Sequence, residues 1–123
     1  MYEEQIAQAE EKLRVAELLL KEGFYNDAVS RAYYCIFFAA SALLSTKGIS
    51  IKTHKGLLSQ FSLEFIKTGQ IDDSFIKAFK IAKELREEAD YSIVRQLSRE
   101  EALSVLADAK KFLMKTKQII KEI

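Results

Sequence analysis

The sequence predicts an all-α protein, an antiparallel up-and-down bundle of four to five helices. Apolar residues recur at spacings of three and four, as in Ile6, Ala9, Leu13, Ala16 and Leu20, and no segment alternates with period two over a useful length. The chain has no proline, and three of its four glycines fall where helical patterns end. Five helices joined by such short connections become mostly antiparallel neighbours.

The first two helices have recognisable ends. The stripe that begins at Ile6 is expected to stop at Gly23, which suits the C′ position of a helix. Asn26 is a good N-cap for the second helix, and the negative charge of Asp27 in the first turn stabilises the helix by interacting with its dipole. This helix is expected to run to about Thr46, with the glycine two residues later as its stop.

The remaining three helices are marked by caps and glycines. The third begins near residues 50–53 and carries an apolar face, namely Leu57, Leu58, Phe61, Phe65 and Ile66. Gly56 inside it costs about 1 kcal/mol against alanine, so it is expected to mark a close helix approach. Asp72 or Asp73 caps the fourth helix, and Ser98 with Glu101 forms a capping box for the fifth. The only β-prone piece is "SIV" at 92–94.

Composition limits the classes of function. With 123 residues, 49% of them hydrophobic and 30% charged, the chain is expected to form a single domain over residues 1–123. A formal net charge of +1 gives no global field for nucleic acid or an anionic membrane. Cys35 and His54 are the only residues of their types, which excludes a disulfide framework or a Cys/His zinc cluster within one chain. We therefore expect no metal and no cofactor.

The same features indicate a cytoplasmic protein. A single cysteine favours a reducing compartment. The acidic N-terminus lacks the basic and apolar regions of a signal peptide. The longest apolar run, "CIFFAASALL", is too short to span a bilayer and is broken by Ser41, so no membrane association is expected.

The second helix is apolar nearly all round. Its polar groups fall in a narrow stripe, namely Asp27, Ser30, Tyr34, Ser41 and Ser45. Arg31 lies at the edge of the stripe, one turn after Asp27 and at ion-pair spacing. Either the stripe faces solvent, or it faces a second subunit whose register it fixes. Because such a helix usually packs on two sides, we expect a homodimer that buries about 1,600 Å².

Four strings in order, "AVSRAYYCIFFAASALL", "KTHKGLLSQF", "FIKTGQID" and "ELREEADY", resemble the HEPN (higher eukaryotes and prokaryotes nucleotide-binding) domain family, in its small prokaryotic and archaeal stand-alone branch. The resemblance covers nearly the whole chain. It implies a five-helix bundle and dimerisation. Many relatives are metal-independent endoribonucleases, and some are toxins encoded beside a nucleotidyltransferase-like antitoxin. Others resemble non-catalytic modules that bind a nucleotide or RNA.

The resemblance also implies where a site would lie. Active relatives carry an arginine, then four to six other residues, and then a histidine. The arginine matches Arg86, but Tyr91 stands at the shortest spacing, and Ser92 and Ile93 follow. A tyrosine with a pKa of about 10 is a poor general base at neutral pH, although it can donate a hydrogen bond to phosphate or stack on a base. This departure leans against catalysis and leaves Arg86 and Tyr91 as the catalytic candidates.

Three hypotheses remain open. The first is a dimeric module that binds a nucleotide or single-stranded RNA, paired with a nucleotidyltransferase-like protein in a toxin–antitoxin-type system. The second is a metal-independent endoribonuclease that uses Arg86 with Tyr91 or His54, and the third is a protein-interaction module only. The ligand-binding candidates are Arg31, Tyr34, His54, Arg86, Asp90 and Tyr91. Two simpler explanations stand beside them. His54 could be a surface or capped residue, and Arg86 could merely pair with Asp90 one turn on.

Overall fold

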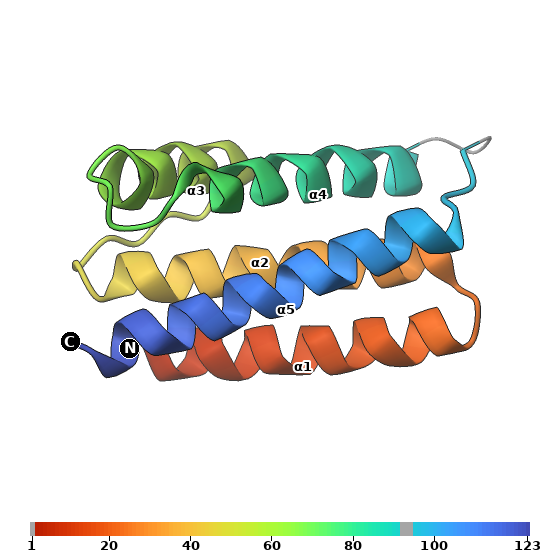
Figure 1. Cartoon of the computed structure of the whole chain (residues 1–123), viewed down its shortest axis with the longest axis horizontal. Helices are drawn as coiled ribbons and strands as arrows, with labels where there is room; N and C mark the ends of the chain where they lie inside the picture. Colours follow the sequence, from red (N-terminus) through yellow and green to blue (C-terminus); the bar gives the residue numbers. More distant parts are fainter. Residues whose placement is uncertain (1, 92–94) are drawn as a thin grey trace.

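The computed structural model describes residues 2–91 and 95–123, and it confirms the all-α bundle. Four long helices alternate in direction: α1 (Tyr2–Lys21), α2 (Tyr25–Ser45), α4 (Asp73–Tyr91) and α5 (Arg99–Lys121) (Figure 1). The short α3 (His54–Phe61) and the π-helical turn η1 (Ser62–Ile66) join α2 to α4 at the end of the bundle where both termini lie. The third predicted helix is therefore an α-helix that widens into a π-turn.

The turn between α1 and α2 confirms one predicted helix end and corrects another. Gly23 has φ +86°. Its N–H donates to the carbonyl of Leu20 at 3.1 Å, and the N–H of Phe24 donates to Leu19 at 2.9 Å, which is a Schellman ending. The prediction that Asn26 caps α2 is wrong. The helix begins at Tyr25 without a side-chain cap, because the carboxamide of Asn26 is engaged elsewhere.

The second helix is the centre of the bundle. It packs against α1, α5, α4 and α3, and along one broad face its apolar residues are fully buried, namely Ala28, Ala32, Cys35, Ile36, Ala39, Ala42 and Leu43. By length and composition α2 could cross a membrane, which the short apolar run did not suggest. However, 61% of the tested window is buried inside the bundle, and the core helix of a folded domain passes the same test.

An aromatic cluster joins the two halves of the core. Phe61 of α3 lies 5.2 Å from Phe112 of α5, and Phe79 of α4 lies 6.0 Å from each of them, between ring centroids. All three side chains are buried, and each contributes roughly 1.5–3 kcal/mol by leaving water. This cluster holds α3 and α4 against α5 and so fixes the position of the α4 face described below.

The remaining helix starts are set locally. Thr53 caps α3 by accepting from the N–H of Gly56 at 3.0 Å, and the capping box between Ser98 and Glu101 is present as predicted. Asp72 accepts from the N–H of Ser74 at 2.9 Å in the first turn of α4. Gly56 does not mark a close approach of two helices. A Cβ there would meet Thr53 Oγ1 at 2.6 Å and Ile51 Cγ2 at 2.8 Å, so the crowding comes from the adjacent cap.

Candidate functional site

Arg86 occupies a position on the buried face of α4, one turn after Ala82 and two turns after Phe79. The residue is only 7% exposed. Its guanidinium carbon lies 5.0 Å from the ring centroid of Tyr33, 5.8 Å from Tyr34 and 5.9 Å from Tyr91. We call these four residues the Arg86 cage. Each desolvated contact between a cation and a ring face stabilises the charge by about 1–2 kcal/mol.

A carboxylate closes one side of the cage. Arg86 Nη1 donates to Asp90 Oδ2 at 3.2 Å, and the hydroxyl of Ser30 on α2 donates to the other oxygen at 2.7 Å. The predicted i, i+4 pair is therefore present, and its carboxylate also joins α4 to Ser30 of α2. Burial alone would lower the pKa of Arg86. Hydrogen bonding to Tyr91 and Asp90 and the nearby hydroxyls of Tyr33 and Tyr34 raise it above its ordinary value.

The guanidinium keeps unused hydrogen-bonding capacity. Arg86 Nε is buried and has no hydrogen-bond partner in the described part of the chain. Arginine presents five N–H donors in a planar fork that matches the oxygens of phosphate or carboxylate. The cage therefore holds a permanent positive charge in a fixed orientation, beside one exposed aromatic ring, because Tyr91 is 77% exposed.

His54 lies beside the same cage, at the start of α3. The hydroxyl of Tyr33 is hydrogen-bonded to His54 Nδ1 at 2.7 Å, and the imidazole centroid lies 4.9 Å from that of Phe37. Burial, followed by the positive charges of Arg86 and Lys83, lowers the pKa of His54. The imidazole is therefore mostly neutral at neutral pH, and it is neither a fully exposed residue nor a helix cap.

The structure thus brings together five of the six candidate ligand residues and omits one. Tyr34, His54, Arg86, Asp90 and Tyr91 form one cluster. Arg31 is exposed, and within the described residues it has no ion pair, either with Asp27 or with another acid. Ser92 and Ile93, the alternative positions for the family histidine, lie outside the described residues.

Tyr33 is the member of the site that the sequence argument missed. It is fully buried, and it contacts both Arg86 and His54. Burial is the main cause that raises the pKa of its hydroxyl, so the group stays protonated. A buried tyrosine hydroxyl needs a hydrogen-bond partner. In the sequence, the need of a buried tyrosine for such a partner was the one available sign that Tyr33, like its neighbour Tyr34, contacts polar groups.

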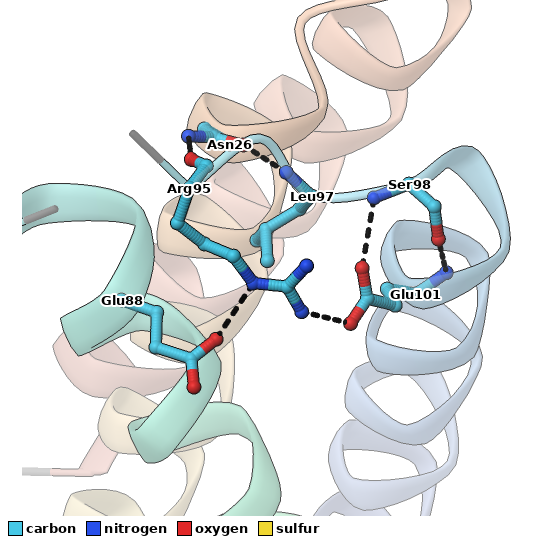
Figure 2. Close-up of polar contacts among 6 residues, drawn as sticks. All are labelled: Asn26, Glu88, Arg95, Leu97, Ser98 and Glu101. Atoms are coloured by element: carbon cyan, nitrogen blue, oxygen red, sulfur yellow. Dashed lines mark hydrogen bonds and ion pairs between the residues drawn. The ribbon is translucent and has the colours of Figure 1, made fainter. Parts of the chain in front are cut away.

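The end of α4 is tied to two other helices just beyond the cage (Figure 2). Arg95 Nε donates to Glu88 of α4 at 3.0 Å, and Arg95 Nη2 donates to Glu101 of α5 at 2.5 Å. Asn26 of α2 donates to the carbonyl of Arg95 at 3.1 Å and accepts from the N–H of Leu97 at 2.9 Å. We call this set the Asn26 clamp, and it explains why Asn26 does not cap its own helix.

Comparison with known proteins decides the family. Residues 2–119 match the model of the HEPN domain. The chain belongs to the HEPN domain family. Two similar proteins from Methanocaldococcus jannaschii carry the names "Putative toxin MJ0605" and "Putative toxin MJ0142". The first is 39% identical over 94% of this chain and 85% of its own length. The second is 40% identical over 96% of this chain and 80% of its own length.

Two further comparisons concern a curated protein and a solved structure. A UPF0332 protein from Thermotoga maritima is 35% identical over 94% of this chain and 87% of its own length. The crystal structure of TT1696 from Thermus thermophilus superposes with a TM-score of 0.80 at 20% identity, over 95% of this chain and 96% of that one. At that identity the superposition shows the shared fold alone. Within the described residues of this HEPN protein, no group of three or more His, Cys, Asp or Glu could hold a metal ion.

Proposed function

We propose that this protein is a non-catalytic HEPN module, a single domain in the cytoplasm that binds a nucleotide or single-stranded RNA as a homodimer. The Arg86 cage carries the proposal. It offers a buried guanidinium with an unpartnered Nε and an exposed ring at its edge, and a phosphate beside a base matches both groups. The local charge agrees with this ligand, because Arg31, Lys52 and Lys55 are exposed and have no ion pair within the described residues.

The support for a dimer comes from the edge of the cage. The apolar surface of α2 is largely covered by α1, α3, α4 and α5 of the same chain, so an excess of apolar surface on that helix is a weak argument. Tyr91 and Arg31, by contrast, are both exposed to solvent. A two-fold axis near them would place two cages in one groove, and an anion between two guanidinium groups would relieve their repulsion.

The names of the relatives suggest a genetic setting. Two relatives carry the name "Putative toxin". The toxin of a toxin–antitoxin pair is neutralised by its antitoxin. We propose that this protein also works in a toxin–antitoxin-type system, with a nucleotidyltransferase-like partner protein. Co-purification with the product of an adjacent nucleotidyltransferase-like gene tests this part of the proposal, and a protein that never associates with that product contradicts it.

A second candidate function rests on His54. A metal-independent endoribonuclease needs a group that transfers a proton at the ribose hydroxyl and a cation that stabilises the phosphorane. Tyr91 is a poor base, but the imidazole of His54 has a lowered pKa and is mostly neutral. It stacks on the ring of Tyr33, which Arg86 also contacts, so a base and a cation lie close together. His54 is therefore the residue to substitute if purified protein cleaves RNA.

One pair of experiments separates these functions. Titration calorimetry at low salt is expected to show weak binding of short single-stranded RNA, micromolar or looser, that weakens as salt rises. Arg86→Met should weaken it strongly, whereas Arg14→Met, an exposed arginine in the middle of α1, should not. RNA should stay intact in the same samples, with or without magnesium. Cleavage that is lost in His54→Asn would establish the nuclease, and the absence of any RNA binding would leave the protein-interaction function.

A further inference from the structure

A cavity of about 290 Å³ lies between the start of α1, the second half of α2 and the connection to α3, and one of its lining residues, Phe37, contacts Tyr33 and Tyr34 of the Arg86 cage. Its walls include Phe37, Phe38, Ser41 and Ser45 of α2, with Gln5 of α1 and Lys52 at other sides. One water molecule takes up about 30 Å³ of liquid, so this space has room for a flat ring system. Nothing in the proposed role of Arg86 accounts for the cavity.

Gln5 gives the cavity a chemical preference. Its Nε2 donates to the hydroxyl of Ser45 at 3.1 Å, while its Oε1 is buried and has no hydrogen-bond partner among the described residues. A buried carbonyl oxygen without a partner is costly, and rotation of the Gln5 side chain toward the cavity that it lines would let a ligand N–H remove that cost. The exocyclic amino group of a nucleobase is such a donor, and glutamine is a usual partner for the amino group of adenine.

The cavity walls suit the rest of a base. The rings of Phe37 and Phe38 meet edge to face, with centroids 5.5 Å apart, and both are only partly buried. Bases stack on such rings with little dependence on sequence. Lys52 is exposed and has no ion pair within the described residues, so its ammonium group remains available to a phosphate.

The cavity and the cage lie along one side of α2. Ser30, Tyr34, Ser41 and Ser45 form the polar stripe of this helix; the first two lie at the cage, and the last two line the cavity. Phe37 connects the two places, since it lines the cavity and contacts His54. Tyr34 and Ser41 are separated by seven residues, or about 10 Å along the helix. A nucleotide chain with stacked bases covers that distance in about three steps.

We propose that this cavity is a base-binding pocket that selects a nucleobase with an exocyclic amino group, with adenine as the test case. The inference rests on the proposed nucleotide-binding function and names the base which that function selects. The base stacks against Phe37 and Phe38 and donates its amino N–H to Gln5 Oε1. A phosphate two or three nucleotides away then reaches the guanidinium of Arg86.

The test compares RNA trinucleotides of adenosine and of purine riboside, which differ only in the exocyclic amino group. Titration calorimetry on the full chain at low salt is expected to show about tenfold tighter binding of triadenosine, the effect of one hydrogen bond to an otherwise unpaired buried group. Gln5→Leu should reduce this preference to below about twofold. Gln8→Leu is the matched control, because Gln8 is exposed on the same helix and does not line the cavity.

A second variant covers the case in which Gln5→Leu disturbs the fold. Ser41→Leu fills the pocket from α2, and it should weaken triadenosine binding toward the level of the purine riboside trinucleotide while circular dichroism stays unchanged. Arg86→Met should weaken both trinucleotides alike and leave their ratio near ten. Equal binding of the two trinucleotides to the parent protein, with Arg86→Met still weakening both, would overturn the pocket and leave the proposed function standing. Binding of neither would overturn both.

Discussion

Asp90→Asn is expected to destabilise the protein more than Arg86→Met does, although Arg86 is the more deeply buried residue. The reasoning starts from the pair itself, in which Nη1 and Oδ2 lie 3.2 Å apart and the side chain of Asp90 is 37% exposed. A hydrogen bond between charged groups contributes about 1.5–3 kcal/mol when fully buried. Solvent screening at the exposed carboxylate reduces this to about 1 kcal/mol.

Arg86→Met removes that pairing and the three ring contacts of the guanidinium, which together contribute about 4–6 kcal/mol. It also removes the cost of holding a cation out of water, which is several kcal/mol. The methionine side chain still fills most of the space, so no large cavity forms. We therefore expect the free energy of unfolding of Arg86→Met to differ from that of the parent protein by no more than about 1 kcal/mol. Asp90→Asn leaves the buried cation in place with a weaker acceptor, and it should cost about 1–2 kcal/mol.

Urea unfolding followed by circular dichroism measures the change in the free energy of unfolding for both variants. In a thermal scan of a chain this long, a loss of 1 kcal/mol lowers the midpoint temperature by about 3–6 °C. The double variant should be close to Arg86→Met alone, because the carboxylate matters mainly as a counter-ion. A loss above about 3 kcal/mol in Arg86→Met, or no loss in Asp90→Asn, would refute this account of the cage. The main role of Arg86 would then be to stabilise the fold.

Three further predictions concern the whole molecule. Light scattering at micromolar concentration should give twice the chain mass of 14.1 kDa, and a clean monomer would contradict the dimer. The pKa of His54 is lower in the folded state than its unfolded value of about 6.5, so the contribution of His54 to the free energy of unfolding is complete above pH 6.5 and is lost as the pH falls toward the folded pKa. In His54→Asn the free energy of unfolding should depend less on pH in that range. Asn26→Ala removes two hydrogen bonds of the clamp and should cost about 1–2 kcal/mol in urea unfolding, whereas Gln70→Ala at an exposed position should cost almost nothing.

The helix ends could be predicted from the sequence because they are settled by neighbours in the chain. Gly23, Gly48 and Gly69 all have positive φ, between 74° and 86°, which is the conformation that ends a helix and favours glycine. The capping box of α5 likewise involves residues three apart. Asn26 failed the same reasoning because its partners are 69 and 71 residues away, and nothing in the local pattern reveals them.

The site was predictable only in part, for a similar reason. Family resemblance pointed to Arg86 and Tyr91, and helix spacing alone identified the pair with Asp90. Helix spacing could not show that Arg86 is buried, since an arginine within an apolar stripe usually extends to solvent. Tyr33 was missed because its role depends on His54 and Arg86, which reach it from two other helices.

The Asn26 clamp also has a consequence for how the protein folds. Helices α1 and α2 form a hairpin whose contacts are local, and such a hairpin can form early. The cage needs Ser30 and Asp90, 60 residues apart, and the clamp needs residues that lie next to the start of α5. Asp90, Arg95 and Leu97 are synthesised after α1 and α2, so these two helices can form before the site exists. Binding through Arg86 is then a property acquired in the final step of folding, when the last helix docks and holds the end of α4 in place.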